Sequence, residues 1–495
     1  MRRERLVVVG NGMAATRLVE TLVARRYDGR ITVIGEEPVP AYNRILLSAV
    51  LEGTHRAAAL TMRDPEWLAS VGVDLRLGSR VLELSRTASH VVLVDGTTVP
   101  YDRLVLATGA IATLPPIRGL VQVDGQLHPK VHAFRSLADC EGLLDALVPD
   151  AGQRAVVVGG GLLGVQVARA LGVRGVTTEI VEGSEHLLST QLDERGGSIL
   201  ERGLKKLGSD VYTGARAVRL VDEGLRLDNG CTLQTDLVIL AAGGRPSTAL
   251  ARQAGLFVRR GVVVDGHLTS ITDPRVHAIG DCAEFAGRVT GFVSPAWEQA
   301  VVLAEHLCGG EASYSGSRSV ARLRASDLEV AVLGEPERSD GEVVEVTNPI
   351  AGTHRKLVVR GGVIVAAALV GDLARVGLIT QLYDQRTVLG AHEPGELLMA
   401  ERPTPAESAE LPDDAEVCAC AGVSAARIRA CRTVDEVCGA TRATTGCGGC
   451  TSVVEQLLAG GGPVSKGFHD GNKAGPSRQH GPPSFLSQVV RKESS

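Results

Sequence analysis

Four cysteines near the end of the sequence have the spacing of metal ligands. Cys418 and Cys420 form a C-x-C pair, and Cys447 and Cys450 form a C-x-x-C pair within the run TTGCGGC. Four thiolates brought together suit either a 2Fe-2S cluster or a zinc ion. The glycines of that run let backbone amides point at cluster sulfurs, where a bulky side chain would obstruct them. The pattern therefore favours the 2Fe-2S cluster and leaves structural zinc as the alternative.

The stretch between the two cysteine pairs predicts two short helices that bring the pairs together. Ser424 can cap a helix that runs through Arg429, and Thr433 can cap another that runs through Ala440. Cys431 and Cys438 fall at helical positions within this stretch. We expect these two cysteines to be buried packing residues and not ligands.

A second chemical signal is a glycine turn that follows an apolar strand near the start of the chain. The run from Leu6 reads LVVVGNGMAA and contains Gly10, Gly12 and the small Ala15 where a third glycine often stands. Such a turn lets the backbone approach a pyrophosphate, whose charge then lies at a helix N-terminus. The next predicted strand ends before Glu36, about where a ribose-binding acid belongs. By itself the run is a weak signal, because ordinary strand-turn-helix units contain similar glycines.

The same design recurs in the middle of the chain and is complete there. A β-branched run leads into Gly159, Gly161 and Gly164, and the following strand ends at Glu182. This is the G-x-G-x-x-G spacing in the context that the motif requires. A carboxylate at Glu182 would bind both ribose hydroxyls and repel a 2′-phosphate, which favours NADH over NADPH. A solvated glutamate at a strand end is the alternative interpretation.

Three further places are suited to a second nucleotide. Arg44, in the segment PAYNRILLS, could approach a phosphate or a ring. Thr108 and Gly109 follow a buried strand where a large side chain would obstruct a bound cofactor. Asp281, in the segment VHAIGDCAE, could hydrogen-bond a polyol. Simpler interpretations are a solvated loop arginine for Arg44 and a helix N-cap for Asp281.

The composition excludes several classes of function. Apolar residues make up 44 % of the chain, charged residues make up 22 %, and the formal net charge is -5, so nothing indicates nucleic-acid binding. The arginines at the start imitate a signal peptide, but glycines interrupt the apolar run and no cleavage site follows. The apolar run Val363 to Val370 is too short to span a bilayer. We expect a cytoplasmic protein without membrane contact.

Taken together, the motifs resemble the two-dinucleotide-fold flavoprotein reductases, most of all the flavoprotein part of NADH-dependent nitrite reductase and the electron-transfer subunit of assimilatory nitrate reductase. The resemblance covers roughly Arg5 to Cys450. It implies FAD held by Gly10, Gly12, Ala15, Glu36, Arg44, Thr108, Gly109 and Asp281. It also implies NADH held by Gly159, Gly161, Gly164 and Glu182. The segment FVSPAWEQA resembles the one beside the flavin ring, which places Trp297 near the isoalloxazine or, alternatively, in the core.

The chain departs from this family in two ways. Related ferredoxin reductases carry a lysine and a glutamate that pair near the flavin, where this chain has Ala49 and Gln166. The contact that positions the nicotinamide is therefore not predicted, and no catalytic acid or base is nominated. No cysteine precedes Cys140, so the redox-active thiols that disulfide reductases place beside the flavin are missing. Electrons must leave the flavin by another route.

The cysteine segment resembles the small ferredoxin-like domain of bacterioferritin-associated ferredoxin and of nitrite reductases. That resemblance implies that Cys418, Cys420, Cys447 and Cys450 bind a 2Fe-2S cluster. The stretch between the pairs is several residues shorter than in those relatives, which should shorten a helix or loop but keep the ligands.

The predicted fold is α/β, with two dinucleotide-binding (Rossmann-like) domains of the glutathione-reductase type, a small α+β domain and a small helical 2Fe-2S domain. The predicted boundaries are FAD-binding domain 1–118 and 246–312, NADH-binding domain 119–245, α+β interface domain 313–400, linker 401–413, 2Fe-2S domain 414–460 and disordered tail 461–495. The interface domain is expected to cover the flavin or to build a homodimer.

The predicted function is electron transfer from NADH through FAD and a 2Fe-2S cluster to a separate enzyme. No cysteine for a sirohaem and 4Fe-4S domain follows Cys450. A molybdenum nitrate reductase catalytic subunit is therefore the first expected partner and a sirohaem nitrite reductase the second. Two alternatives remain open: an NADH-dependent rubredoxin or ferredoxin reductase of a monooxygenase system, and a non-enzymatic iron-sulfur redox sensor.

Overall fold

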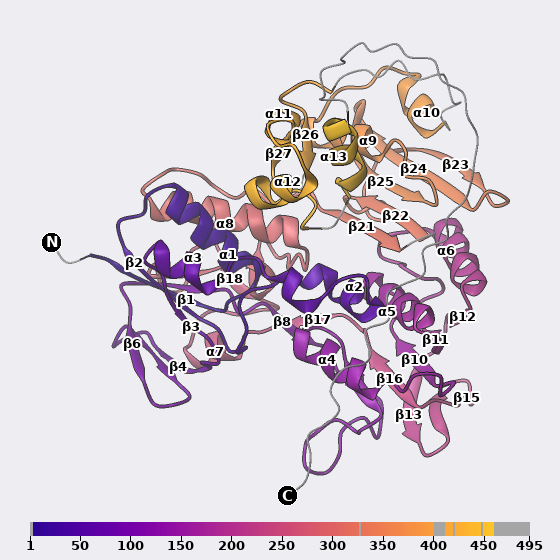
Figure 1. Cartoon of the computed structure of the whole chain (residues 1–495), viewed down its shortest axis with the longest axis horizontal. Coiled ribbons are helices and arrows are strands. Elements are labelled where there is room, and N and C mark those ends of the chain that lie inside the picture. Colours follow the sequence, from indigo (N-terminus) through magenta and orange to yellow (C-terminus); the bar gives the residue numbers. More distant parts are fainter. Residues whose placement is uncertain (1–2, 326–327, 400–410, 419–420, 447–448, 460–495) are drawn as a thin grey trace, which may run out of the picture.

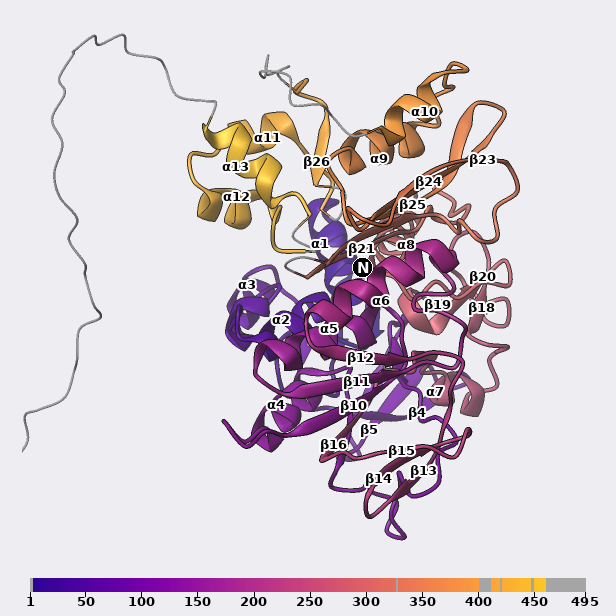
Figure 2. The same ribbon diagram turned by 90° about the vertical axis from the view of Figure 1, so that its right-hand side faces the viewer.

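The computed structural model describes residues 3–325, 328–399, 411–418, 421–446 and 449–459. Two parallel sheets form the lower body of the molecule in Figure 1, and an antiparallel sheet and a small C-terminal module lie above them. In the view of Figure 2 the C-terminal helices lie above the first helices of the chain.

The first sheet is wholly parallel. In spatial order it consists of β19 (Val276–Ala278), β7 (Arg103–Leu106), β1 (Arg5–Val9), β2 (Arg30–Ile34) and β3 (Asp74–Arg76). Most side chains of β1 are buried, as in a parallel sheet covered on both faces. Helices α1 (Met13–Ala24) and α8 (Val293–Leu307) pack against each other beside this sheet. The central strand β1 thus leads directly into the first glycine turn.

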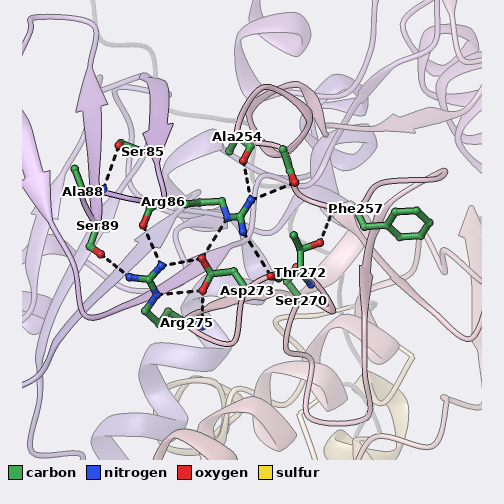
Figure 3. Close-up of polar contacts among 11 residues, drawn as sticks. Ser85, Arg86, Ala88, Ser89, Ala254, Phe257, Ser270, Thr272, Asp273 and Arg275 are labelled. Atoms are coloured by element: carbon green, nitrogen blue, oxygen red, sulfur yellow. Dashed lines mark hydrogen bonds and ion pairs between the residues drawn. The ribbon is translucent and has the colours of Figure 1, made fainter.

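A buried carboxylate joins the late part of this unit to its early part (Figure 3). Asp273, whose side chain is 4 % exposed, accepts hydrogen bonds from Arg86 over 3.2 Å and from Arg275 over 3.0 Å. Arg275 also donates to Ser89 Oγ, and Arg86 donates to the carbonyl oxygen of Ala254. Burial alone would raise the pKa of Asp273, but the hydrogen bonds from the two arginines hold that pKa below its usual value. Segments far apart in the sequence therefore form one unit.

The second sheet repeats the first and is also parallel. In spatial order it consists of β12 (Ser209–Tyr212), β11 (Thr177–Val181), β10 (Arg154–Val158), β16 (Leu237–Leu240) and β9 (Val131–Ala133). Its helices are α4 (Leu137–Ala146), α5 (Leu162–Val173) and α6 (Glu194–Lys206). Helix α5 also packs against α2 (Leu47–Glu52) of the first unit.

The third sheet is antiparallel. In spatial order it consists of β21 (Val320–Ala325), β22 (Leu328–Leu333), β25 (Val363–Val370), β24 (Thr353–Arg360) and β23 (Glu342–Asn348), and it carries α9 (Val376–Gln385) and α10 (Glu393–Leu398). Asp193, which caps α6 through the N–H of Gly196, links this sheet to the second unit. Its carboxylate lies 3.2 Å from His354 Nε2 and 3.4 Å from Lys356 Nζ.

The C-terminal module is small and mostly helical. It consists of the strand pair β26 (Glu416–Cys418) and β27 (Val423–Ser424) and of helices α11 (Ala425–Arg429), α12 (Val434–Thr441) and α13 (Thr451–Ala459). Val423, Ile428, Val437 and Val454 are fully buried in its core. Both views place the module beside α1 (Figures 1 and 2).

Short elements connect these parts. They are η1 (Arg44–Leu46), η2 (Ala57–Leu60), α3 (Pro65–Ser70), β4 (Val81–Ser85), β5 (His90–Leu93), β6 (Thr98–Pro100), β8 (Ala110–Ala112), β13 (Ala217–Val221), β14 (Gly224–Leu227), β15 (Thr232–Leu233), β17 (Gly244–Pro246), α7 (Ala249–Gln253), β18 (Val262–Val264), η3 (Gly280–Cys282) and β20 (Ala283–Phe285). Within the part of the chain that the structure describes, every helix is too short or too polar to cross a lipid bilayer.

The predicted fold class is confirmed by the two parallel dinucleotide-type sheets. The strands β1 and β10 lie directly before the two glycine turns, as predicted, and β2, β7 and β11 end where the sequence predicts a strand end. Strands β9, β12 and β21 and helix α13 are not predicted from the sequence. The domain boundaries stay predictions, and most of the predicted linker 401–413 and the whole tail 461–495 lie outside the described residues.

Candidate functional site

The first glycine turn has the geometry that a close approach demands. Gly10 ends β1 with φ +112, and a Cβ there would lie 2.2 Å from the carbonyl oxygen of Ala107. Gly12 is the N-cap of α1, and a Cβ there would meet no atom within 4 Å. Ala15 is buried within α1. Gly10 is thus required by the packing of the chain, whereas the space beside Gly12 is open to a ligand.

The ends of two neighbouring strands bring further candidates to the same edge of the sheet. Thr108 and Gly109 follow β7, and Thr108 Oγ1 donates to the carbonyl oxygen of Ser247 over 2.7 Å. Asp281 lies in η3 after β19, next to Gly280, where a Cβ would be only 3.2 Å from Ala14 of α1. Because the strands are parallel, their carboxyl ends meet where ligands bind to sheets of this kind.

Charged partners of these residues include Arg135, which the sequence does not single out, and Glu37, which directly follows Glu36. Arg135 Nη2 donates to Asp281 over 2.7 Å, and its Nε donates to the carbonyl oxygen of Ala110. Arg44 pairs with Glu37, and its Nη1 donates to the carbonyl oxygen of Arg135 over 3.1 Å. Arg44, Arg135 and Asp281 are therefore linked through one another. Glu37 pairs with Arg44 at one end of this series of contacts.

Glu36, the acid named from the sequence, lies apart from this group. Its side chain is 70 % exposed, and its nearest charged partner is Arg80, at 3.6 Å. It follows β2, where a ribose would have to be bound. The structure thus brings Arg44, Thr108, Gly109 and Asp281 together around the turn and leaves Glu36 at the rim.

The second glycine turn repeats the geometry of the first. Gly159 has φ +116, and a Cβ there would lie 2.6 Å from the carbonyl oxygen of Ala241. At Gly164 a Cβ would lie 1.9 Å from the carbonyl oxygen of Gly159, whereas at Gly161, the N-cap of α5, it would meet nothing within 4 Å. Glu182 accepts the N–H of Gly160 over 2.6 Å and that of Ser184 over 2.8 Å. The acid is fixed beside the turn by these bonds.

An arginine that the sequence analysis does not single out lies near Glu182. A Cβ added to Gly183 would be 3.4 Å from both Cγ and Nε of Arg216, an exposed residue just before β13. Arg216 lies far from Glu182 in the sequence and is brought beside Gly183 only by the fold. It supplies a positive charge next to the acid that would bind a ribose.

A cavity of about 1460 Å³ opens where the three sheets and the C-terminal module meet. Every part of the molecule contributes side chains to its wall. They include Arg17, Arg44 and Trp297 of the first unit, Leu162, Leu163 and Gln166 of α5, Arg318 and Asp384 of the third unit, and Cys418 and Cys450 of the module. The wall is therefore shared by both glycine-turn helices and by the cysteine segment.

Trp297 both packs against α1 and faces the cavity. Its indole Nε1 donates to the carbonyl oxygen of Met13 over 3.1 Å, which anchors α8 to the first turn of α1. The ring also lines the cavity, and the guanidinium of Arg17 lies 5.7 Å from its centre. A packing role and a place beside a bound ring are compatible here.

Two carboxylates of the cavity wall, Glu298 and Asp384, have raised pKa values. Burial raises the pKa of Glu298, and the charge of nearby Asp384 raises that pKa further, although hydrogen bonds from Ser317 and Ser294 oppose the shift. Burial also raises the pKa of Asp384, against the positive charge of Arg318. Both groups therefore hold a proton more readily than ordinary surface carboxylates do.

Two of the four predicted metal ligands are described, and both fit a thiolate site. Cys418 and Cys450 are buried at 4 % and 6 % exposure, and both line the cavity. The N–H of Thr444 donates to Cys450 Sγ over 3.2 Å, the kind of bond that stabilises a ligating sulfur. Cys420 and Cys447 lie outside the described residues. Among the described residues, no other cysteine lines this cavity.

The comparisons with known proteins decide the family. The model of the pyridine nucleotide-disulphide oxidoreductases matches residues 4–302, which include both glycine turns and Asp281. The chain belongs to this family. Its fold and its class of chemistry are those of an oxidoreductase, and the family implies FAD and NAD(P)H as cofactors. The resemblance to the two-dinucleotide-fold flavoprotein reductases is thereby confirmed.

Relatives within the family extend the match beyond residue 302. The chain is 33 % identical over 474 residues to a nitrite reductase [NAD(P)H] of Bacillus subtilis (strain 168), covering 92 % of this chain and 58 % of the relative. It is 31 % identical over 476 residues to the assimilatory nitrate reductase electron transfer subunit of the same organism, covering 92 % and 60 %. The chain thus spans somewhat more than half the length of these relatives.

Other relatives match the reductase part alone. The chain is 33 % identical to the nitric oxide reductase FlRd-NAD(+) reductase of Salmonella agona (strain SL483), covering 68 % of this chain and 87 % of the relative. Among solved structures it resembles putidaredoxin reductase in its covalent complex with putidaredoxin, with TM-score 0.73, 25 % identity and coverage of 81 % and 96 %.

Proposed function

We propose that this chain takes electrons from NADH through FAD and passes them singly, through a 2Fe-2S cluster, to the catalytic component of a nitrate or nitrite reductase. One observation carries the proposal: the helices that follow both glycine turns and two cysteines of the C-terminal module line a single cavity. Flavin, nicotinamide and cluster would then meet without any movement of the module.

FAD would be bound at the edge of the first sheet. The space beside Gly12 would take the pyrophosphate at the N-terminus of α1, where backbone N–H groups and the helix dipole favour negative charge. Arg135 holds Asp281 beside the same edge, where its carboxylate would accept hydrogen bonds from the sugar chain of the cofactor. Trp297 and Arg44 would border the ring in the cavity.

NADH would be bound at the second turn, with its pyrophosphate beside Gly161 and its ribose at Glu182. Helix α5 would then direct the nicotinamide into the cavity past Leu163 and Gln166. Gln166 is neutral, so this chain orients the ring by packing and amide hydrogen bonds and not by a charged pair. Close stacking of the two rings is what the protein contributes to hydride transfer.

Cys418, Cys420, Cys447 and Cys450 would hold the cluster. When bound, it would accept one electron at a time, which divides the pair that NADH delivers to the flavin. The buried thiols of Cys418 and Cys450 and the N–H bond from Thr444 favour a cluster in this place.

The partner is proposed from the relatives. The printed names of two relatives specify nitrite reductase and the electron transfer subunit of assimilatory nitrate reductase. A molybdenum nitrate reductase catalytic subunit is the first choice and a sirohaem nitrite reductase the second. A cytoplasmic location is part of this proposal. A small electron-carrier protein of rubredoxin or ferredoxin type is the second candidate acceptor, because the Salmonella relative is named an FlRd-NAD(+) reductase and the similar solved structure holds putidaredoxin reductase bound to putidaredoxin.

Anaerobic titration of the purified full chain with NADH tests the proposal. Flavin absorbance should bleach, and the electron-resonance signal of a reduced 2Fe-2S cluster should follow, with two irons and no zinc per chain. Flavin bleaching without that signal, or one zinc per chain, would overturn the cluster assignment. Turnover too slow to support an acceptor would instead favour a redox sensor. Recovery of neither reductase in a pull-down from nitrate-grown cells would remove the proposed partners.

A further inference from the structure

An ion pair joins the C-terminal module to the helix that follows the first glycine turn. Arg442, directly after α12, pairs through Nη1 with Glu20 Oε1 of α1. Arg63 donates to the same oxygen of Glu20 over 2.6 Å. The Glu20 side chain is only 10 % exposed. A carboxylate this buried would destabilise the fold without its cationic partners. The contact therefore contributes more to stability than an exposed surface ion pair does.

A second contact lies beside the first and involves an amide. Asn43 Nδ2 donates to the carbonyl oxygen of Thr445 and lies 3.4 Å from that of Gly446. Asn43 is 4 % exposed, and its Oδ1 accepts the N–H of Ile45 at the start of η1. The amide is therefore held in one orientation by its own segment. The next residue, Arg44, lines the cavity.

Residues 442–446, which we call the docking loop, also reach the cysteine site. The N–H of Thr444 is the donor to Cys450 Sγ. The same short loop thus touches α1, the segment around Asn43 and a predicted cluster ligand. A shift of this loop would move Cys450 relative to the cavity.

We propose that Glu20 and Asn43 are positioning residues that clamp the docking loop, and with it the iron-sulfur site, against the flavin cavity. The inference rests on the proposed function. The step that it serves moves one electron from NADH-reduced flavin to the oxidised cluster, with no bond made or broken. Because such transfer slows steeply as two centres separate, a fixed contact serves it better than a module held only by the chain at 401–413.

The test uses the full chain with its cofactors and the variants Glu20→Gln, Asn43→Ala and the double variant. Both residues lie outside the module, so iron content should equal that of the wild type. Glu305→Gln is the matched control, because it removes the Arg25–Glu305 pair of 2.7 Å directly after the C-terminal end of α1, within the first unit alone. Anaerobic stopped-flow mixing with NADH follows flavin bleaching and cluster reduction separately. Hydrogen exchange of the docking loop is measured without NADH.

In the double variant we expect flavin bleaching at the wild-type rate, cluster reduction slower by about tenfold and faster exchange in the docking loop. The control should match the wild type in all three. Wild-type cluster reduction together with wild-type exchange in the double variant would overturn the inference. If the wild-type chain itself yields no reducible cluster, the proposed function fails. In that case the hydrogen exchange of the docking loop still tests the clamp. Unchanged exchange in the double variant refutes the clamp, and faster exchange supports it.

Discussion

Arg169 of α5 and Glu52 of α2 form a two-pronged ion pair between the two dinucleotide-binding units. Nη1 donates to Oε2 over 2.6 Å and Nη2 donates to Oε1 over 3.1 Å, with side chains 7 % and 16 % exposed. Each residue lies three positions after one where related ferredoxin reductases carry a charge and this chain has Ala49 or Gln166. The charged contact between α2 and α5 thus lies one helical turn further along both helices. Here the acid is on α2 and the base is on α5, the reverse of the arrangement in those reductases.

Replacing Arg169 with alanine should destabilise the chain by about 3 kcal/mol, because Glu52 would stay enclosed without its partner. The midpoint of thermal unfolding measures this. The double variant Arg169→Ala/Glu52→Ala should lose less stability than the single variant Arg169→Ala, because no unpaired carboxylate remains. Arg195→Ala is the control: it removes a pair with Glu345 in which the arginine is 62 % exposed, and it should cost less than about 1 kcal/mol. Equal losses in Arg169→Ala and Arg195→Ala would contradict the prediction.

The choice between NADH and NADPH should depend on Glu182 and Arg216 together. Glu182→Ala should raise the KM for NADH about tenfold, since a charged hydrogen-bond acceptor is lost. It should also allow NADPH to react, because the carboxylate that would repel a 2′-phosphate is removed while Arg216 lies beside Gly183. Steady-state kinetics with ferricyanide and both coenzymes measure this. Adding Arg216→Ala to Glu182→Ala should abolish the new activity with NADPH. If that activity persists in the double variant, Arg216 does not bind the 2′-phosphate.

Two glycine substitutions should separate binding from folding. Gly12→Ala places a methyl group in open space, so the thermal stability of the apoprotein should not change while FAD retention falls. Gly164→Ala places it 1.9 Å from the carbonyl oxygen of Gly159, which should destabilise the fold by about 2 kcal/mol. Thermal unfolding with and without FAD measures both. FAD retained at the wild-type level by Gly12→Ala would exclude this turn as the pyrophosphate site.

Acid should weaken the fold partly through Asp273. Its folded pKa lies below the ordinary aspartate value of about 3.9, so its stabilisation is complete above that value and is lost as pH falls through the folded pKa. Asp273→Asn should lower stability at pH 7 by about 3 kcal/mol, because two arginines lose their charged partner. The loss should shrink as the pH is lowered from 5 to 3, as measured by urea unfolding. A pH-independent loss would contradict this assignment.

The fold and both glycine turns could be predicted because their signals are local. A β-branched run, a glycine spacing and an acid one strand later all lie within one short stretch, and the structure has them as predicted. Helix α13 could have been found from Val453, Val454, Leu457 and Leu458, which recur at helical spacing. Strand β21 gives a weaker signal, since arginines alternate with its few apolar residues.

Contacts between distant residues could not be predicted in this way. Arg135 meets Asp281 across 146 positions, and Arg442 meets Glu20 across 422. A lone arginine in a loop has the same sequence signal whether it is solvated or paired. Arg216 next to Gly183 is a further case, because only the folded chain brings β13 to the end of β11. Tertiary packing decides these positions.

Asn43 and Arg44 are consecutive, yet one holds the docking loop and the other lines the cavity. The length of chain between the two contacts is a single peptide unit, about 3.8 Å from Cα to Cα. An insertion or deletion at this point would put one of them out of reach of its partner. Among homologous sequences that have both cysteine pairs, gaps should therefore fall elsewhere, whereas those without the module should tolerate length variation here.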